Sequence, residues 1–284
     1  AEAMKRDGEN KLRLAGISLP QAVSPTTVIP DTADIVLVAI PTQAMGDYLR
    51  DHAATLENRT LVACNKGIDL ASGLGPTGII AQACPNSVAS VLSGPSFAID
   101  IAKGLPTALT IAANDEQAAT RLQEQLSTNS IRLYRSTDVQ GVEIGGALKN
   151  VIAIAAGLTM GNGLGESARA ALMTRGFAEL SRFAMARGAK PETLAGLSGL
   201  GDLVLTCTSE KSRNYSHGLA IGRGKNTQAG KTVEGISTAR IVTKLGKDMG
   251  IPLPVTELVD AVLSGKTTVD QARDVLLSRP LKKE

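Results

Sequence analysis

The sequence predicts an α/β protein in which a parallel sheet forms the first half of the chain and helices alone form the second. Short β-branched runs alternate with helix-like segments between Thr32 and about Arg135, as in a parallel sheet covered on both faces. After about Asp138 the pattern changes to long Ala- and Leu-rich segments of helical periodicity. A length of 284 residues also favours two domains. We therefore expect a first domain at 1–138 and a second at 139–284.

Each half has its own expected elements. Strands are predicted at 34–40, 60–65, 88–92, 107–112 and 131–134. Helices are predicted between them at 43–56, 76–84, 97–103 and 115–127, and the chain starts in a further helical segment. In the second half, glycines at 199–201 and 222–224 and prolines at 252 and 254 divide the chain into separate helices.

Composition excludes several classes of function. Only six residues are aromatic and none is tryptophan, so a base-stacking platform for nucleic acid is not expected. The net charge of +3 is spread along the chain and gives no basic stripe. No apolar run approaches the roughly 18 residues of a membrane span, and the charged start AEAMKRDGENKLR does not resemble a signal peptide. We therefore expect no nucleic acid partner and no membrane span.

Cysteine and histidine usage indicates a reducing compartment and no metal site. The cysteines Cys64, Cys84 and Cys207 are odd in number, far apart and without a CxxC pair, so we expect free thiols in a cytoplasmic protein. His52 and His217 are the only imidazoles, which leaves too few ligands for a zinc centre. Proton transfer is therefore expected to use Lys, Asp or Glu.

Two glycine-rich segments resemble phosphate-binding motifs in sequence but lack the spacing or structural context that such motifs require. Residues 73–78 (GLGPTG) fit GxGxxG, but the preceding strand ends eight residues earlier, whereas a dinucleotide fingerprint begins directly after its strand. Residues 224–232 (GKNTQAGKT) resemble a P-loop, but five residues instead of four separate the glycines and no strand precedes them. Neither segment is expected to hold phosphate.

Polar residues follow three of the predicted strands, where ligands bind in an open α/β sheet. The segments are 41–43 (PTQ), 65–67 (NKG) and 93–96 (SGPS). Gly, Pro and Ser are common turn formers, so Gly94 or Pro95 taken singly favours an ordinary turn. Lys66 at a strand end is the stronger functional candidate, with a solvated surface lysine as the alternative.

Lys149 is the candidate base of the helical half. It enters a helix expected over 141–160, in which residues 151–158 are apolar on every side. Burial disfavours an ammonium group, which lowers the pKa of a lysine and makes it a proton acceptor near neutral pH. A lysine that reaches to solvent is the alternative. Gly145 and Gly146 favour the functional interpretation, because they let another backbone or a ligand approach.

Residues 199–214 (GLGDLVLTCTSEKSRN) predict an anion site. Ser212 can cap a helix running to about Gly222, which places Arg213 and Asn214 in its first turn. Free N–H groups and a guanidinium suit phosphate, although serine caps and surface arginines are common without any ligand. Asp202 is either a second cap or a carboxylate that orients a lysine or accepts substrate hydroxyls.

Together these segments resemble the bacterial NAD(P)-dependent glycerol-3-phosphate dehydrogenase family. The resemblance runs from about residue 1 to 275. Its most specific motifs are NKG at 65–67, LSGPSFA at 92–98, GGALKNVIAIAAG at 145–157, ARAALMTRG at 168–176, GLGDLVLTCTS at 199–209, SRN at 212–214 and VEG at 233–235. It implies a Rossmann-like cofactor domain followed by an all-helical substrate domain.

The resemblance also implies an activity. Members interconvert sn-glycerol 3-phosphate and dihydroxyacetone phosphate by hydride transfer with NAD or NADP, and supply glycerol 3-phosphate for phospholipid synthesis. The implied partner is thus a small-molecule substrate, and the family allows a homodimer.

By matching position, the resemblance implies roles for particular residues. Lys149 resembles the proton acceptor, and Lys66 and Asp202 act with it at the reacting end of the substrate. The implied substrate contacts are Lys66, Gly94, Ser96, Lys149, Asp202, Ser212, Arg213 and Asn214. The implied cofactor contacts are Lys66, Ala98, Arg213 and Glu234. No metal is implied.

The sequence departs from the family pattern at the front. Relatives begin with a strand, a GxGxxG turn, a helix and a second strand, and AEAMKRDGENKLR matches the segment after these. Residues 1–284 are therefore expected to bind dinucleotide poorly, and a preference for NAD or NADP is not readable. Two alternatives stay open: another hydroxyacid or sugar-phosphate dehydrogenase of this plan, and a non-catalytic sugar-phosphate-binding protein. Retention of Lys66, Lys149, Asp202 and 212–214 argues against the second.

Overall fold

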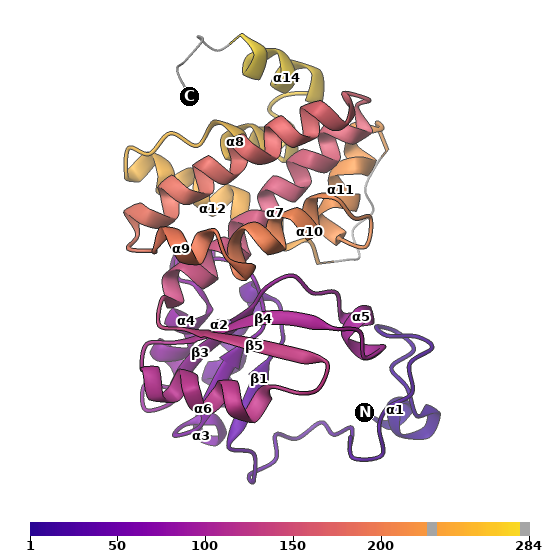
Figure 1. Ribbon diagram of the computed structural model, residues 1–284, viewed down its shortest axis with the longest axis vertical. Coiled ribbons are helices and arrows are strands. Elements are labelled where there is room, and N and C mark those ends of the chain that lie inside the picture. The colour runs from indigo at the N-terminus through magenta and orange to yellow at the C-terminus, as the bar shows by residue number, and fades with distance from the viewer. Residues whose placement is uncertain (226–231, 279–284) are drawn as a thin grey trace.

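In the computed structural model, which describes residues 1–225 and 232–278, a sheet lies at one end of the molecule and a group of helices at the other (Figure 1). The strands are β1 (Ile35–Val38), β2 (Thr60–Ala63), β3 (Val88–Ser93), β4 (Thr107–Ala113) and β5 (Ile131–Ser136), and they lie in this order across the sheet. The five predicted strands are confirmed, with every end within two residues of its predicted position.

The sheet is mixed, so the expectation of a purely parallel sheet is wrong at one pair. β1–β2, β2–β3 and β4–β5 are parallel, whereas β3 and β4 are antiparallel, with Val91 opposite Ala112. The connection between them contains only α5 (Ala98–Ala102). A helix of that length spans about 7.5 Å, too short to carry the chain back along the sheet. The chain therefore enters β4 at the edge where it left β3.

Helices cover both faces of the sheet, as predicted. They are α2 (Thr42–Asp51), α3 (Ala53–Leu56), α4 (Pro76–Ala83) and α6 (Glu116–Leu126), and the helix expected over 43–56 is divided at His52. Successive side chains of a strand point to opposite faces. Leu61 and Ala63 of β2 pack with residues of α2 and α4, while Val62 packs with Leu122 of α6. Before β1, the chain forms α1 (Glu2–Asp7) and one isolated bridge between Glu9 and Ser18.

After residue 138 the described chain contains helices and no strand, as expected. The elements are α7 (Val139–Gly161), α8 (Gly165–Ala186), α9 (Pro191–Leu194), the π-helical turn η1 (Leu197–Gly201), α10 (Asp202–Cys207), α11 (Arg213–Gly222), α12 (Glu234–Asp248), α13 (Pro254–Leu263) and α14 (Val269–Leu277). α7 is buried on all sides and packs against α8, α10, α11 and α12. This central helix extends toward the sheet and contacts β3 and β4 (Figure 1).

α7 is also apolar and long enough, by length and composition, to cross a membrane. The expectation that no apolar run reaches this length is therefore wrong for Val139–Gly161. In the structure, 89% of its most apolar window is buried inside the protein. A helix enclosed by other helices needs apolar residues on every side, so its place in the core accounts for its composition.

Two glycines allow α7 and α11 to cross at very short range. A Cβ built at Gly218 of α11 would overlap the carbonyl oxygen of Ile154, and one at Gly157 of α7 would overlap that of Tyr215. Both obstacles are backbone atoms, which cannot rotate away as a side chain can. The spacing of the two helices therefore depends on the absence of side chains at these positions.

We expect Gly218→Ala to lower the free energy of unfolding by about 1–3 kcal/mol, because overpacking forces the two helices apart. Urea unfolding followed by circular dichroism measures this change. Gly46→Ala is the matched control, since Gly46 lies in α2 with only van der Waals neighbours around an added Cβ. Its stability should be unchanged or higher, because alanine is the better helix former. Equal stability of the two variants would contradict the close crossing.

Candidate active site

Lys66 lies in the loop after β2 and points across the edge of the sheet toward the helical half. Its Nζ donates to the carbonyl oxygen of Gly94, at 3.0 Å, and to Oδ2 of Asp202, at 2.5 Å. Gly94 follows β3 with φ +146°, and a Cβ there would lie 3.1 Å from Cα of Leu109. Glycine is required at this turn both for its backbone angle and for lack of room.

Asp202 joins the two lysines predicted to be functional. It is the first residue of α10, directly after η1, and only 1% of its surface is exposed. Its Oδ1 accepts from Nζ of Lys149 at 3.0 Å, while Oδ2 accepts from Lys66. Its side chain makes no cap bond to a backbone N–H, so the interpretation as a helix cap is wrong. The carboxylate instead holds two ammonium groups together.

Thr206 completes this cluster and was missed by sequence reasoning. Its hydroxyl accepts from Nζ of Lys149 at 2.7 Å and donates to Oδ1 of Asp202 at 3.1 Å. The available signal was spacing, because residues four apart in a helix share a face. Asp202 and Thr206 therefore present their oxygens to the same lysine.

Lys149 is buried in α7, as predicted, with 7% of its surface exposed. Burial lowers its pKa to about 8, and the charge of Lys66 acts in the same direction, while Asp202 opposes both. Burial alone would raise the pKa of Asp202, but the charges and hydrogen bonds of the two lysines hold it below its usual value. The cluster thus combines an ionised carboxylate with an amine that releases its proton slightly above neutral pH.

The glycines before Lys149 permit close approach, as expected. A Cβ at Gly145 would lie 3.0 Å from the carbonyl oxygen of Ser198, and one at Gly146 would lie 2.7 Å from Oγ of Ser93. η1 and the end of β3 can therefore pack directly on this turn of α7. This packing positions Lys149 beside the strand ends.

A series of hydrogen bonds connects the site to the start of α12. Nδ2 of Asn214 donates to Oδ1 of Asn150 at 2.8 Å, and its Oδ1 accepts from the backbone N–H of Gly235 at 3.0 Å. Asn150 in turn donates to the carbonyl oxygen of Lys66 at 3.4 Å. Asn150 was missed by sequence reasoning, and its only signal was its place next to Lys149. The pair fixes α11 and α12 relative to the Lys66 loop.

Ser212, Arg213 and Glu234 lie around the N-terminus of α11. Ser212 caps the helix, and its Oγ accepts from the N–H of Tyr215 at 3.2 Å, as predicted. Arg213 is exposed at the first helical position. The carboxylate of Glu234 accepts from the N–H of Thr42 at 3.1 Å. Burial raises the pKa of Glu234, against the effects of that N–H and of the nearby Arg213 charge.

Comparison with known proteins places this arrangement in a family. A glycerol-3-phosphate dehydrogenase (NAD(P)+) of Cereibacter sphaeroides is 60% identical over 273 residues, which cover 96% of this chain and 89% of the relative. Family profiles for the N-terminus and C-terminus of NAD-dependent glycerol-3-phosphate dehydrogenase match residues 1–119 and 138–274. This chain belongs to the NAD-dependent glycerol-3-phosphate dehydrogenase family.

Further relatives of the same name agree with this assignment. The protein of Paracoccus denitrificans is 57% identical, over 98% of this chain and 88% of the relative. The crystal structure of the glycerol-3-phosphate dehydrogenase from Coxiella burnetii superposes with a TM-score of 0.93 at 33% identity, over 98% of this chain and 88% of that one. The predicted fold, a Rossmann-like sheet domain followed by a helical domain, is confirmed.

Two residues implied by the resemblance to this dehydrogenase family lie at the margin of the cluster. Oγ of Ser96 donates to the carbonyl oxygen of Gly94 at 3.4 Å, so it shares an acceptor with Lys66. Ala98 is exposed at the start of α5 and has no polar side chain. A contact from Ala98 to a cofactor would use its backbone.

The glycine-rich segment at 73–78 does not join the site. Residues 73–75 form the end of the loop that leads into α4, and residues 76–78 are the first residues of that helix, so the segment is not a turn directly after a strand. The N–H of Thr77, in the first turn of that helix, already donates to Glu143 at 2.6 Å. Most of the segment 224–232 lies outside the described residues. Among the residues described, no group of three or more His, Cys, Asp or Glu side chains could hold a metal ion.

The loops after β1 and β2 have features that suit the cofactor of this dehydrogenase family. Oδ1 of Asn65 is buried and has no hydrogen-bond partner in the described chain, although its Nδ2 donates to Thr42 at 2.9 Å. A Cβ at Gly67 would lie 2.6 Å from Oγ1 of Thr42 and 2.9 Å from Oε2 of Glu234. An unpartnered acceptor beside a closely packed glycine turn fits a ligand that carries hydroxyl or amide donors. NAD(P) carries both.

Proposed function

We propose that this chain interconverts glycerol 3-phosphate and dihydroxyacetone phosphate with NAD(P). The observation that carries the proposal is the buried cluster Lys66–Asp202–Lys149 at the carboxyl ends of the strands, where α/β proteins bind ligands. The proteins named glycerol-3-phosphate dehydrogenase that match almost the whole chain support the choice of substrate.

Lys149 is proposed as the base. Oxidation of the C2 hydroxyl requires removal of its proton, and a neutral amine with a pKa of about 8 can accept it. Asp202 and Thr206 hold Nζ in place through bonds of 3.0 and 2.7 Å. In the opposite direction, the Lys149 ammonium returns the proton to the C2 oxygen. NAD(P), when bound, supplies the hydride acceptor or donor.

Lys66 is proposed to orient the reacting end of the substrate. The Lys66 side chain is 18% exposed, compared with 9% for Lys149, so Lys66 can reach a bound oxygen. Asp202 and the carbonyl oxygen of Gly94 aim it. A cation beside the C2 oxygen stabilises negative charge that develops there during hydride transfer. Asn65, Thr42 and Glu234 are the proposed neighbours of the cofactor.

The N-terminus of α11 is proposed to bind the phosphate. The first turn of a helix presents free N–H groups and positive partial charge, and Arg213 adds an exposed guanidinium. Asn214 is held by Asn150 and Gly235, which keeps this helix start at a fixed distance from Lys66. The substrate would thus be held at both ends.

A substrate profile tests the activity. The purified protein is mixed with NADH or NADPH and dihydroxyacetone phosphate, and loss of reduced cofactor is followed by absorbance. We expect turnover with this substrate and almost none with dihydroxyacetone or with 2-oxo acids. Faster turnover of another ketone would favour a different dehydrogenase of this plan. Saturable binding of the phosphorylated substrate without any turnover would favour a binding protein.

Arg213→Ala is expected to raise KM for dihydroxyacetone phosphate about 10- to 100-fold, since a charge-assisted bond to phosphate is lost. kcat should fall much less, because Arg213 makes none of the hydrogen bonds that hold Lys66 and Lys149. Steady-state kinetics separate the two constants. Arg240→Ala, at an exposed position of α12, is the control and should leave KM unchanged. An equal loss of activity toward phosphorylated and unphosphorylated ketones in Arg213→Ala would contradict the phosphate role.

We also propose the division of the chain into domains at 1–138 and 139–284, since α7 begins at Val139 and leads into helices alone.

A cytoplasmic location is proposed from the three free cysteines. Supply of glycerol 3-phosphate for phospholipid synthesis and a homodimer are proposed from the family. Light scattering measures the molar mass in solution, which for a homodimer should be twice the mass of one chain.

A further inference from the structure

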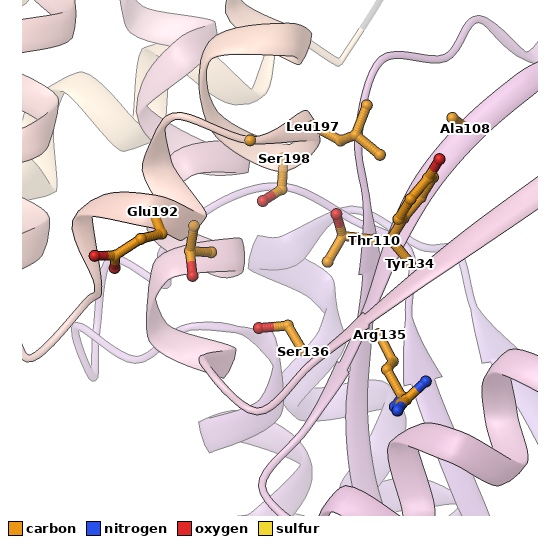
Figure 2. Close-up of a pocket in the computed structure, with 10 residues that line it drawn as sticks. Ala108, Thr110, Tyr134, Arg135, Ser136, Glu192, Leu197 and Ser198 are labelled. Carbon is orange, nitrogen blue, oxygen red and sulfur yellow. The ribbon is translucent and has the colours of Figure 1, made fainter.

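A cleft of about 400 Å³ lies between the two ends of the molecule, bounded by β4 and β5 on one side and by α9 and η1 on the other (Figure 2). Tyr134, Thr110 and Ser136 come from the strands, while Thr193, Leu197 and Ser198 come from the helical half. None of its lining residues belongs to the lysine cluster or to the predicted cofactor contacts. The cleft is therefore a separate concave surface.

Ser198 places an unsatisfied hydroxyl on the wall of this cleft. Only 1% of the residue is exposed, and its Oγ has no hydrogen-bond partner within the described chain. Figure 2 shows Ser198 across the cleft from Thr110 and Ser136. A buried hydroxyl without a partner costs stability, and a bound molecule that supplies a partner would remove this cost. The hydroxyl of Ser198, which has no hydrogen-bond partner in the described chain, therefore indicates a ligand with hydroxyl groups.

The charges around the cleft disfavour an anion. The guanidinium of Arg135 is directed away from the other lining residues (Figure 2), and it is engaged by Glu116 at 2.7 Å and by Gln123 at 3.0 Å. Arg132 lies over the ring of Tyr134, 5.6 Å from its centroid, and is not a lining residue. Glu192 belongs to the helical wall, but its carboxylate is also directed away from the other lining residues (Figure 2). No lining cation remains available for a phosphate or carboxylate.

Apolar surface forms the rest of the wall. The ring of Tyr134 is half-exposed, and Leu197 and Ala108 add aliphatic atoms near it. A sugar ring has an apolar C–H face and hydroxyls at its edge, so it can pack on an aromatic ring while bonding to nearby hydroxyls. Thr110, Thr193 and Ser136 surround Ser198 with further hydroxyls. The volume lies near the lower limit for small-ligand sites, which suits a single ring.

We propose that this cleft binds a small uncharged polyol of hexose size, with its C–H face on Tyr134 and a hydroxyl bonded to Ser198. The ligand would contact both halves of the molecule. η1, which carries Ser198, continues directly into Asp202. Neither Lys66 nor Lys149 lines the cleft. The polyol and glycerol 3-phosphate therefore occupy different sites and bind at the same time rather than in competition.

Ligand-detected NMR with glucose tests the proposal on the wild-type protein without any turnover. We expect saturable binding with Kd of about 1–10 mM, corresponding to a small ligand with few hydrogen bonds, and weaker binding of glucose 6-phosphate. Ser198→Ala should weaken glucose binding about fivefold, which is the effect of one hydrogen bond. Its melting temperature without glucose should be unchanged or higher, because the orphan hydroxyl is gone. A purely structural serine would lower it.

Tyr134→Ala should weaken glucose binding about fivefold or more, because the stacking surface is removed. Tyr48→Ala, at a partly exposed tyrosine of α2, is the matched control and should leave it unchanged. Absence of saturable glucose binding would overturn the proposal. So would unchanged affinity in both cleft variants, or displacement of glucose by saturating glycerol 3-phosphate, which would place glucose in the catalytic site.

Discussion

Replacing Lys149 by methionine is expected to lower kcat by about 10²- to 10⁴-fold, the usual contribution of a positioned acid–base group. Methionine fills similar space in the apolar interior of α7, so the fold should persist. Asp202 retains Lys66 as its ion-pair partner at 2.5 Å, and no buried charge is left alone. Steady-state reduction of dihydroxyacetone phosphate measures kcat, and circular dichroism checks the fold.

Lys149→Arg separates a base from a mere positive charge. A guanidinium is protonated at all accessible pH values, so it keeps the charge beside Asp202 but cannot accept a proton. We expect this variant to be almost as inactive as Lys149→Met. Lys244→Met, at an exposed lysine of α12 paired with Asp248, should retain full activity. Substantial turnover by Lys149→Arg would remove the base assignment.

The pH dependence of the wild-type enzyme should differ between the two reaction directions. As the proposed base, Lys149 must be a neutral amine for the oxidation of glycerol 3-phosphate, and its pKa is about 8, so kcat/KM should rise with pH up to about that value. Reduction of dihydroxyacetone phosphate needs the ammonium, so its rate should fall above the same pH. Initial rates measured in both directions across this range check the prediction. If the rates in both directions rose with pH, or if both fell, the prediction would be contradicted.

The strand and helix order of the sheet domain was predictable from the sequence, because β-branched runs and helical periodicity are local signals. The antiparallel pairing of β3 with β4 was not, since it depends on how the short α5 returns the chain to the same edge. That α7 is apolar enough to cross a membrane was not predicted either, for a different reason. Its glycines and its polar residues Lys149 and Asn150 interrupt the continuous apolar run, while the mean hydropathy of the helix stays high.

The sequence proposed the main residues of the candidate site, but it did not predict the contacts between them. Lys66, Lys149 and Asp202 were each candidates from local pattern or family resemblance, yet they are separated by 53 to 136 positions along the chain. Only the tertiary structure shows that one carboxylate binds both lysines. Thr206 and Asn150 had only weak signals, the four-residue spacing from Asp202 and the place next to Lys149. Their roles arise from the packing of α10 and α11 on α7, which sequence periodicity alone does not fix.

Asp202→Asn is expected to lower the free energy of unfolding by about 3–5 kcal/mol at neutral pH, because the buried Lys149 and the partly buried Lys66 lose their counter-charge. The folded protein can relieve this cost by releasing the proton of Lys149, so the pKa of that lysine should fall further below about 8. A folded-state pKa below the unfolded value makes stability rise with pH between the two values. The defect should therefore shrink as pH increases. Urea unfolding over a range of pH values measures both effects.

Asp100→Asn is the matched control for this substitution. Asp100 pairs with Lys211 at 3.0 Å, but Lys211 is exposed and Asp100 only partly buried, so its loss should cost about 1 kcal/mol or less. A defect of that small size in Asp202→Asn would contradict the shared-carboxylate arrangement. Lys66→Met provides the second test. Adding it to Asp202→Asn removes one of the two uncompensated charges, so the double variant should be more stable than the sum of the single effects predicts. Strict additivity would mean that Lys66 and Asp202 do not interact, and the proposed aiming of Lys66 at the substrate would lose its basis.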